Sequence, residues 1–484
     1  MSYQFSELKP SHLWKHFEQI LIIPHCSGNE KGLADYIISQ AKRLNLVWKK
    51  DPVGNVVVSK KATTGHENAE TVILQGHLDM VCEKNSDIIH DFTKDSIESE
   101  IREGWVCAKG TTLGSDNGVG LSASLAIMED NSLIHGPLEF LFTVDEETGL
   151  TGARRLTVDF LKGKRLINLD SEDEGTFTIG CAGGADSEII IPIKRKKSKS
   201  RNAFRLKLLG LRGGHSGLDI NKGRGNAIKL LARILWQVRK EIPYELLLIE
   251  GGSKRNAIPR EAWADVLVDT SKVKSLMSLI NEAFIKVQAE YKTVERDLQY
   301  SCEPVSNKKG EALSQTSQEI LINFLFTCPH GVLSMHPEIE GLVETSTNLA
   351  IVRSKKDRAQ VFCNSRSSIN SALEATRNMI RGLAGLGGAK IRQPEGYPGW
   401  APNLQSSLLK ILKEVYHKVF NKEPEIVAIH AGLECGIIDE KFHGMDMISI
   451  GPTIKYPHSP EEKVEIASVE KFWKFLTVLL AELA

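Results

Sequence analysis

The sequence lacks the features that mark several classes of protein. Its eight cysteines form no Cys-x-x-Cys pair, which argues against a zinc finger and against a disulfide framework. We therefore expect reduced thiols and a cytoplasmic protein. The start of the chain carries no secretory signal, and no apolar run reaches membrane-spanning length. These absences predict a protein that does not bind membranes.

An excess of charge of either sign is also missing. Lys and Arg together number 61, as do Asp and Glu, so no overall field attracts nucleic acid. A basic run at 194–201 lies between two expected strands, and we interpret it as a solvated hairpin turn. The glycine-rich segment 114–120 has neither a P-loop ending nor GxGxxG spacing. We therefore expect no nucleic-acid partner.

The chain does contain enough apolar sequence for a large core. Its 484 residues, 41% of them hydrophobic, predict two or three domains. In the first third, segments with helical periodicity alternate with short apolar runs. Helices are expected at 8–23, 30–44 and 117–130, and strands at 71–74, 138–144 and 165–169. This alternation predicts an α/β domain with a mostly parallel central sheet.

The pattern changes near residue 185 and changes back near residue 399. Between these points we expect the hairpins 187–192 with 202–209 and 347–352 with 360–365, and the helices 228–238 and 273–294. Strands at 425–429 and 447–450 and helices at 404–420 and 469–480 then restore the α/β pattern. We predict an α/β domain formed by 1–184 and 399–484, interrupted by an inserted α+β domain over 185–398.

Potential metal ligands follow several of the expected strands. His77 and Asp79 come after the first buried strand and, two residues apart, project to the same side. Further candidates are Asp116 in a glycine-rich turn, Glu146 and Glu147 after residue 144, Asp170 after residue 169, and His458 after residue 452. In open α/β sheets, side chains beyond the carboxyl ends of the strands meet in one crevice.

This set of side chains suits divalent transition metals. Imidazoles and carboxylates bind zinc, cobalt or manganese, and a carboxylate can bridge two ions about 3.5–4 Å apart that activate a water. Of two adjacent glutamates, one can bind metal while the other acts as a general base. From the residues alone, a solvated Glu-Glu loop and ordinary histidines remain alternatives, and the pairing of ligands stays open.

Five motifs occur in order along the chain. They are Gly76-His77-Leu78-Asp79, Gly114-Ser115-Asp116-Asn117-Gly118, Asp145-Glu146-Glu147-Thr148-Gly149 with Gly152-Ala153, Asp170, and Tyr456-Pro457-His458-Ser459. Together they resemble the M20 family of dinuclear zinc peptidases, and within it the branch of aminoacyl-histidine dipeptidases, over nearly the whole chain. The resemblance implies a zinc-peptidase catalytic domain interrupted by a lid, and hydrolysis of dipeptides that include Xaa-His dipeptides such as carnosine (β-Ala-His).

The resemblance also implies a ligand set. His77 and Asp170 would bind one ion, Glu147 and His458 would bind the other, and Asp116 would bridge them. The expected cofactors are two Zn²⁺ ions per subunit, with Co²⁺ or Mn²⁺ as substitutes.

Two neighbouring carboxylates receive supporting roles from the same resemblance. Glu146 would be the general base that takes a proton from a metal-bridging water and returns it to the leaving amine. Asp79 would lie behind His77 and fix its orientation. Many relatives carry a lysine where this chain has Gly118, a difference that touches only the local loop.

The inserted domain carries further candidates. His215 resembles the lid histidine that stabilises an oxyanion, whether in its own subunit or its partner. Asn256 and Arg366 resemble substrate-contacting residues, and Arg366 suits a bidentate grip on a C-terminal carboxylate. Gly432 is expected to line the pocket, and Glu434 would either receive the substrate ammonium or lie at a helix start. The family also implies a homodimer formed through this domain.

Two other functions remain open. One is an N-acyl or N-acetyl amino acid deacylase that uses the same dinuclear site. The other is a catalytically silent protein that binds metal or peptide, although the presence of both Asp79 and Glu146 argues against it.

Overall fold

The chain is divided between two compact units. The computed structural model describes residues 5–198, 200, 202–305 and 311–484. Unit 1 comprises Met1–Gly180, Trp400–Ala428 and Leu433–Ala484, and unit 2 comprises Cys181–Gly399 and Ile429–Gly432. Unit 1 is therefore assembled from stretches that are far apart in the sequence.

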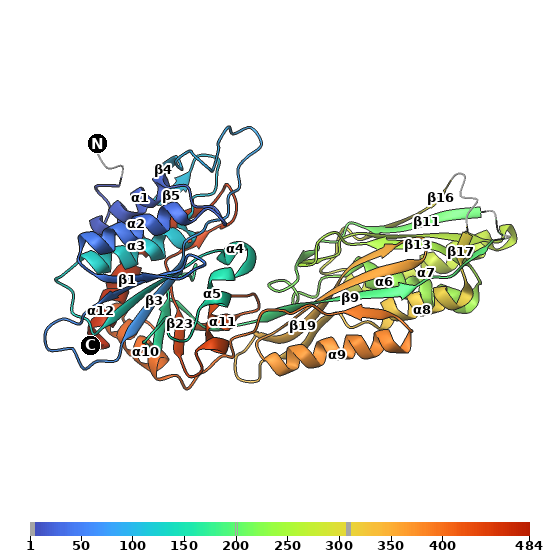
Figure 1. Cartoon of the computed structure of the whole chain (residues 1–484). Coiled ribbons are helices and arrows are strands. Elements are labelled where there is room, and N and C mark those ends of the chain that lie inside the picture. The colour runs from blue at the N-terminus through green and yellow to red at the C-terminus, as the bar shows by residue number, and fades with distance from the viewer. Residues whose placement is uncertain (1–4, 199, 201, 306–310) are drawn as a thin grey trace. The chain divides into compact units, whose positions relative to one another are not determined.

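A mixed β-sheet forms the centre of unit 1 (Figure 1). Its strands are β1 (Val47–Lys50), β2 (Val56–Lys60), β3 (Val72–His77), β6 (Leu138–Thr143), β7 (Arg165–Asn168), β8 (Thr176–Cys181), β22 (Glu425–Ile429) and β23 (Asp446–Ser449). The order is β1-β2-β6-β3-β7-β23-β8-β22. The pairs β6–β3, β3–β7 and β7–β23 are parallel, whereas β1–β2, β2–β6 and β23–β8 are antiparallel. The predicted α/β fold is confirmed.

Helices cover both faces of this sheet and bury its central strands. Unit 1 contains α1 (Ser11–Ile22), α2 (Lys31–Arg43), α3 (Ser115–Glu129), α4 (Glu146–Gly149), α5 (Thr151–Arg155), α10 (Ser407–Phe420), α11 (Glu434–Lys441) and α12 (Ile466–Glu482). In Figure 1, α1, α2 and α3 lie on one side of the sheet and α10 lies on the other, with α12 packed against α10. Strands β3 and β6 are consequently buried along their whole length, as expected of strands covered on both faces.

A smaller sheet in unit 1 connects two distant parts of the chain. It contains β4 (Ser99–Arg102), β5 (Trp105–Ala108), β24 (Ile454–Lys455) and β25 (Lys463–Glu465), in the order β24-β25-β5-β4. Because β25 pairs with β5, the segment after β24 is held beside the segment that leads into α3.

Unit 2 is built on a large antiparallel sheet. The strands of unit 2 are β9 (Gly183–Pro192), β10 (Arg195–Lys197), β11 (Asn202–Leu209), β12 (Gly214–His215), β13 (Glu245–Gly251), β14 (Ala257–Ile258), β15 (Ala262–Val268), β16 (Gln299–Pro304), β17 (Glu311–Leu313), β18 (Gly331–Met335), β19 (Val343–Ser354), β20 (Arg358–Ser367) and β21 (Lys390–Arg392). Strands β10 and β17 form one separate two-stranded sheet, and β12 and β14 form another. The main order is β16-β11-β15-β13-β19-β20-β9-β21, and β18 pairs with β19.

Four α-helices accompany the strands of unit 2 in the described part of the chain. They are α6 (Ala227–Glu241), α7 (Val273–Tyr291), α8 (Gln315–Thr327) and α9 (Asn370–Leu386), with a short 3-10 helix at Thr270–Lys272. Helix α6 begins where the Asn226 side chain accepts hydrogen bonds from Ile228 N and Lys229 N. Its apolar face packs into one cluster with residues from α7, α8 and the sheet, so α6 lies at the centre of the core of unit 2.

One predicted hairpin is wrong. Strand β9 pairs with β20 and β21, whereas β11 pairs with β15 and β16. Alternating apolar residues define a strand but not its partner, and here the partners come from distant parts of the chain. The predicted pairing of 347–352 with 360–365 is present as β19 with β20.

The basic run between β9 and β11 is not the solvated turn that we expected. Residues 195–197 form β10, which pairs with β17, and residues 199 and 201 lie outside the described residues. The Arg195 guanidinium donates hydrogen bonds to main-chain carbonyls of Leu247, Glu311, Lys355 and Lys356. Part of the run therefore connects neighbouring segments of unit 2.

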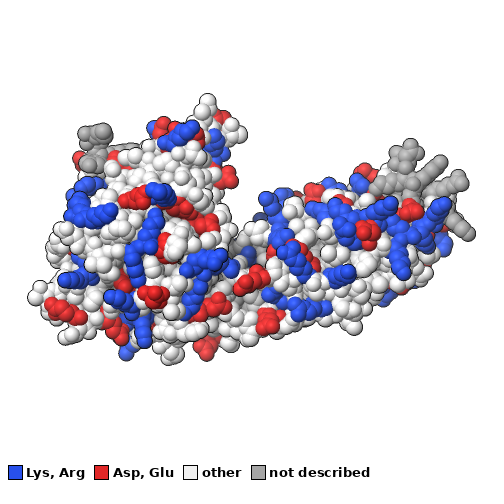
Figure 2. Space-filling model, in the orientation of Figure 1, with Lys and Arg blue, Asp and Glu red and all other residues white. Residues whose placement is uncertain are grey.

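The helices and the surface charge of the protein can be compared with the expectations from its composition. Among the described helices, none has both the length and the apolar character needed to cross a membrane. On the face shown in Figure 2, Lys and Arg side chains are interspersed with Asp and Glu side chains. On this face, as in the composition, neither positive nor negative side chains predominate.

Candidate metal centre

His77 ends β3 and is held in one orientation. Its side chain is 1% exposed, and Nδ1–H donates to the main-chain oxygen of Asp79 at 2.9 Å. Nε2 lies 3.0 Å from Asp116 Oδ1 and 3.3 Å from Asp170 Oδ1. Histidines that bind metal commonly donate their other ring N–H to a carbonyl in this way, so the ring is oriented as a ligand would be.

Asp116 faces two imidazoles with its two oxygens. Oδ1 lies 3.0 Å from His77 Nε2, and Oδ2 lies 3.1 Å from His458 Nε2. The residue stands in the first turn of α3 with non-helical dihedral angles, and the peptide bond to Asn117 is cis. Glu147 Oε1 also lies 3.1 Å from His458 Nε2. Asp116 thus lies between two groups of potential ligands.

These groups fit a pair of divalent cations. Ligand atoms of His77, Asp116 and Asp170 lie within 4.8 Å of one another, as do those of Asp116, Glu147 and His458. Three nitrogen or carboxylate ligands per ion are typical of a zinc site that keeps a position open. Glu147 Oε1 is buried and lies beside His458 Nε2, and a cation bound there would offset the cost of burying this carboxylate.

The concentration of carboxylates affects the protonation of the whole cluster. Burial raises the pKa of Glu146 well above its ordinary value, and burial also raises the pKa values of Glu147 and Asp170. Hydrogen bonds to Asp116 and Glu147 raise the pKa of His458 to about 11. An imidazole must lose its proton before it can bind metal, so metal binding here has to displace protons.

The Asp79 carboxylate supports α4. It accepts hydrogen bonds from Glu146 N at 2.9 Å, Glu147 N at 3.1 Å and Ser27 Oγ at 2.7 Å. Burial opposes its ionisation, but the nearby His77 ring and the hydrogen bonds from Ser27 Oγ and Glu146 N hold the pKa of Asp79 at about 2. The Asp79 main chain therefore orients His77, while its carboxylate anchors the two glutamates.

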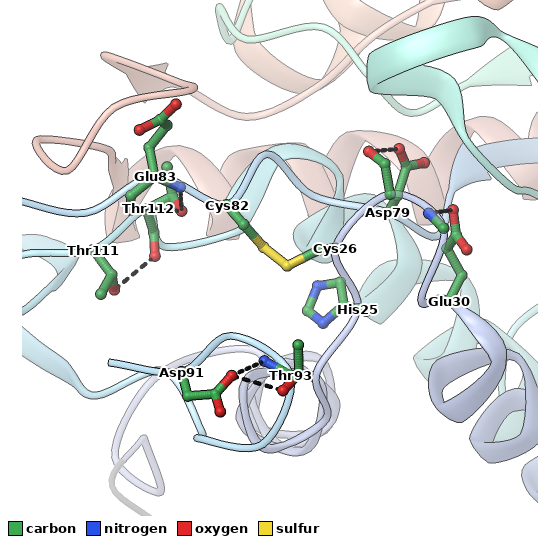
Figure 3. Close-up of a disulfide and its surroundings, with 12 residues drawn as sticks. His25, Cys26, Glu30, Asp79, Cys82, Glu83, Asp91, Thr93, Thr111 and Thr112 are labelled. Carbon is green, nitrogen blue, oxygen red and sulfur yellow. Dashed lines mark hydrogen bonds between the residues drawn. A yellow bond between two sulfur atoms is a disulfide. The ribbon is translucent and has the colours of Figure 1, made fainter. Parts of the chain in front are cut away.

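A disulfide fastens the loop before α2 to the segment after β3. Figure 3 shows Cys26 joined to Cys82, so the expectation of reduced thiols is wrong for this pair. The other six cysteines form no disulfide. The two residues are 56 positions apart, which leaves no local spacing motif. The same loop carries Ser27, which donates to Asp79, and Glu30, which accepts from the main chain just before α4.

Glu434 adds a buried carboxylate to the surroundings of Glu146. It is 1% exposed and accepts hydrogen bonds from Gln75 Nε2 at 2.7 Å and Thr143 Oγ1 at 2.6 Å. Its Oε1 has no hydrogen-bond partner among the described residues. Burial raises the pKa of Glu434 to about 7, and its negative charge helps to raise the pKa of Glu146.

Unit 2 holds His215 in the neutral state. Its Nδ1 accepts from Gly217 N at 3.3 Å and from Leu218 N at 3.1 Å. Burial and then the positive charge of Arg366 lower the pKa of His215. A neutral ring whose Nδ1 is an acceptor carries its hydrogen on Nε2, so His215 can donate from that atom.

The other predicted residues of unit 2 differ in their surroundings. Arg366 is 6% exposed and donates from Nη1 to Tyr397 Oη at 3.1 Å, while its Nε has no partner among the described residues. A Cβ at Gly432 would lie 2.7 Å from Tyr397 Cε2, so only glycine fits beside this ring. Asn256 is exposed, and its carbonyl accepts from Ser216 N at 2.9 Å.

Sequence reasoning missed His430, which belongs to the same group of unit 2 residues. It is 6% exposed, and its Nε2 lies 2.7 Å from Ser346 Oγ, whose residue is the cross-strand partner of Arg366. Burial and then the charge of Arg366 lower the pKa of His430 to about 4. The sequence could have indicated His430, because this histidine directly follows the expected strand 425–429, as His77 follows its own apolar run.

Comparisons with known proteins show that the chain is similar to a family of peptidases. The family model described as Peptidase family M20/M25/M40 matches residues 73–482. A curated relative, the cytosol non-specific dipeptidase of Escherichia coli (strain K12), is 43% identical over 481 residues, which cover 99% of each chain.

Solved structures show the same fold. The aminoacylhistidine dipeptidase of Vibrio alginolyticus aligns with a TM-score of 0.93 and 42% identity over 99% of this chain and 98% of that chain. The aminopeptidase PepT of Bacillus cereus ATCC 10987 aligns with a TM-score of 0.58 and 16% identity over 98% of this chain and 99% of that chain. At this low identity the second likeness concerns the fold alone.

Proposed function

Because the chain belongs to peptidase family M20/M25/M40, we propose that it hydrolyses dipeptides, including Xaa-His dipeptides such as β-Ala-His, at a centre of two metal ions. The observation that carries the proposal is Asp116, whose two oxygens face His77 and His458. Asp170 and Glu147 complete a set of ligands on either side. The names of the two similar proteins, a non-specific dipeptidase and an aminoacylhistidine dipeptidase, support the substrate class.

In this proposal five side chains of unit 1 bind the metal ions. His77 and Asp170 hold one ion, Glu147 and His458 hold the other, and Asp116 is shared. Two divalent cations, Zn²⁺ with Co²⁺ or Mn²⁺ as substitutes, polarise a carbonyl and lower the pKa of a water when bound.

Glu146 then moves the proton. It accepts a proton from the attacking water and returns it to the leaving amine. A raised pKa, caused first by burial, suits a carboxylate that must hold a proton between these two steps. Asp79 keeps Glu146 in place through the Glu146 main-chain N–H.

Unit 2 would supply the groups that recognise the substrate. His215 would donate from Nε2 to the developing oxyanion, and Arg366 would bind the C-terminal carboxylate with help from Asn256 and the space beside Gly432. We further propose a homodimer formed through unit 2, and a location in the cytoplasm.

A panel of substrates tests the proposed reaction. Protein freed of metal by a chelator and reloaded with Zn²⁺ should release amino acids from Ala-His and β-Ala-His, and Glu146→Gln, prepared alongside, should not. Chromatographic detection of free histidine gives the rates. Activity confined to N-acetyl amino acids would replace the proposal with a deacylase. Equal inactivity of the wild type and Glu146→Gln, with both loaded with metal, would indicate a silent binding protein.

The role of Arg366 can be tested by changing its geometry while keeping its charge. Lysine cannot form a bidentate pair with a carboxylate, so Arg366→Lys should lower kcat/KM for Ala-His by about 10–100-fold, mainly through KM, if one to three kcal/mol of charge-assisted hydrogen bonding is lost. Arg358→Lys, at the exposed start of the same strand, is the matched control.

A substrate without the carboxylate isolates this contact. The wild type should cleave Ala-His much faster than its C-terminal amide, whereas Arg366→Lys should discriminate far less between the two. If Arg366→Lys kept the full preference for the free carboxylate, another group would have to provide this recognition.

A further inference from the structure

The buried carboxylate of Glu462 accepts five hydrogen bonds from the described residues. The residue is 2% exposed. Its Oε2 accepts from Leu113 N at 2.9 Å and Gly114 N at 3.1 Å. Its Oε1 accepts from Ser115 N at 2.8 Å, Ser115 Oγ at 2.6 Å and Asp116 N at 3.3 Å. Both oxygens are therefore used to hold the turn that presents Asp116.

The turn depends on an acceptor in this position. Gly114 has φ 74° and ψ 27°, a left-handed conformation that turns successive N–H groups toward one point. These N–H groups precede or begin α3, where no helical carbonyl can accept them. A negative group at this helix end is also favoured by the helix dipole. Without Glu462, four consecutive amides would lose their acceptor inside the protein.

Glu462 also belongs to the segment that carries His458. Strand β25 begins at the next residue and pairs with β5, which lies just before the Asp116 turn. The His458 side chain is 49% exposed, so packing does little to hold it. Its φ of 59° is unusual for a residue other than glycine. The backbone of this segment must therefore be fixed by contacts such as those of Glu462.

We propose that Glu462 is a positioning residue that sets the distance between Asp116 and His458, and thereby the affinity for the metal ion that these two side chains share. This inference rests on the proposed two-metal function. Glu462 touches neither ion nor substrate in this proposal. Glu462 acts on Asp116 by accepting a hydrogen bond from its main-chain N–H. It acts on His458 through the backbone, because it lies four residues further along the same segment.

A purely structural role for Glu462 would have different consequences. A carboxylate that only caps α3 would contribute to the stability of unit 1 and leave the two ions bound as before. The proposed role predicts a larger effect on the ion near His458, because Glu462 holds both the Asp116 turn, which the two ions share, and the segment of His458, which binds one ion only. The ion near His77 and Asp170 has ligands that are held by β3 and by the end of β7, so its affinity should change less.

Glu462→Gln tests this selectivity, because glutamine has the same shape but replaces one acceptor oxygen with an amide NH₂ group that faces main-chain N–H donors. Calorimetric titration of the metal-free protein with Zn²⁺ should show one equivalent bound about 10–100-fold more weakly, the range for lost supporting contacts around a metal site, and the other weakened by a clearly smaller factor. The absorption spectrum of the Co²⁺-substituted protein should lose the contribution of that weaker ion. Excess Zn²⁺ should restore much of kcat.

Glu461→Gln is the matched control, since Glu461 is the exposed neighbour of Glu462 in the same loop. It should bind both equivalents as the wild type does. If Glu462→Gln melts at a lower temperature yet binds both ions with wild-type affinity, Glu462 is only a structural cap and the proposal is wrong. Equal weakening of both ions would also contradict it.

Ser115→Ala provides a second variant if Glu462→Gln does not fold. It removes only the hydroxyl that donates to Glu462 Oε1, and it should weaken the same equivalent in the same direction by a smaller factor. No selective change in Ser115→Ala would then overturn the proposal. Metal titration does not depend on the substrate, so a wild type that binds two ions without cleaving dipeptides would refute the proposed function and leave the role of Glu462 standing.

Discussion

Replacing Glu146 with glutamine is expected to lower kcat by about 10²–10⁴-fold, the usual contribution of a general base, without loss of metal. Glutamine fills the same space but cannot accept a proton from water. The main-chain N–H of residue 146 can still donate to Asp79, so α4 should keep its position. Steady-state rates on Ala-His and metal analysis of the same sample provide both measurements.

Glu147→Gln is the informative comparison, because the two glutamates are adjacent and both are anchored by Asp79. It should lose one metal equivalent, since Glu147 lies 3.1 Å from His458 Nε2 and belongs to the proposed ligand set. Ligand atoms of His77, Glu146 and Glu147 also lie within 4.8 Å of one another. If Glu146→Gln were the variant that lost metal, Glu146 would be a ligand and the roles would have to be exchanged.

Asp116→Asn should weaken the binding of both ions and lower kcat/KM by about 10³-fold or more. Asp116 is the one carboxylate common to the two proposed ligand sets, and an amide bridges two cations poorly. Metal ions contribute several kcal/mol to the stabilisation of transition-state charge, and each 1.4 kcal/mol or so corresponds to a factor of about ten in rate. Metal content after gel filtration and the initial rate are the measurements.

Asp173→Asn controls for the loss of one negative charge in unit 1. The Asp173 side chain is 62% exposed and pairs with Lys455, so this variant should keep two ions and full activity. Two tightly bound equivalents in Asp116→Asn would show that the centre does not need a bridging carboxylate.

The α/β part of the fold was predictable because its strands are buried on both faces. The apolar runs at 71–74 and 138–144 stand out in the sequence, and they correspond to β3 and β6. In unit 2 four of the strands were predicted, β9, β11, β19 and β20, and the pairing of β9 with β11 was wrong. The run at 187–192 pairs with β20 instead of the next strand along the chain, and local periodicity contains no information about this choice.

The cluster of potential ligands was predictable for a geometric reason. His77 and Asp170 follow β3 and β7, which are parallel neighbours, so their side chains emerge at the same edge of the sheet. Supporting contacts were not predictable in this way. Glu462 looks like an ordinary charged loop residue in the sequence, and its importance depends on main-chain N–H groups that only the folded turn brings together.

The interrupted course of unit 1 has a consequence for the protein during its own synthesis. Asp116 is translated 342 positions before His458, an interval of roughly 17–70 s at the usual elongation rates of about 5–20 residues per second. Throughout that time the nascent chain contains Asp116 but not His458, and unit 2 can fold before unit 1 has its last strands. A nascent chain therefore cannot assemble the complete pair of proposed ligand sets until His458 has been synthesised.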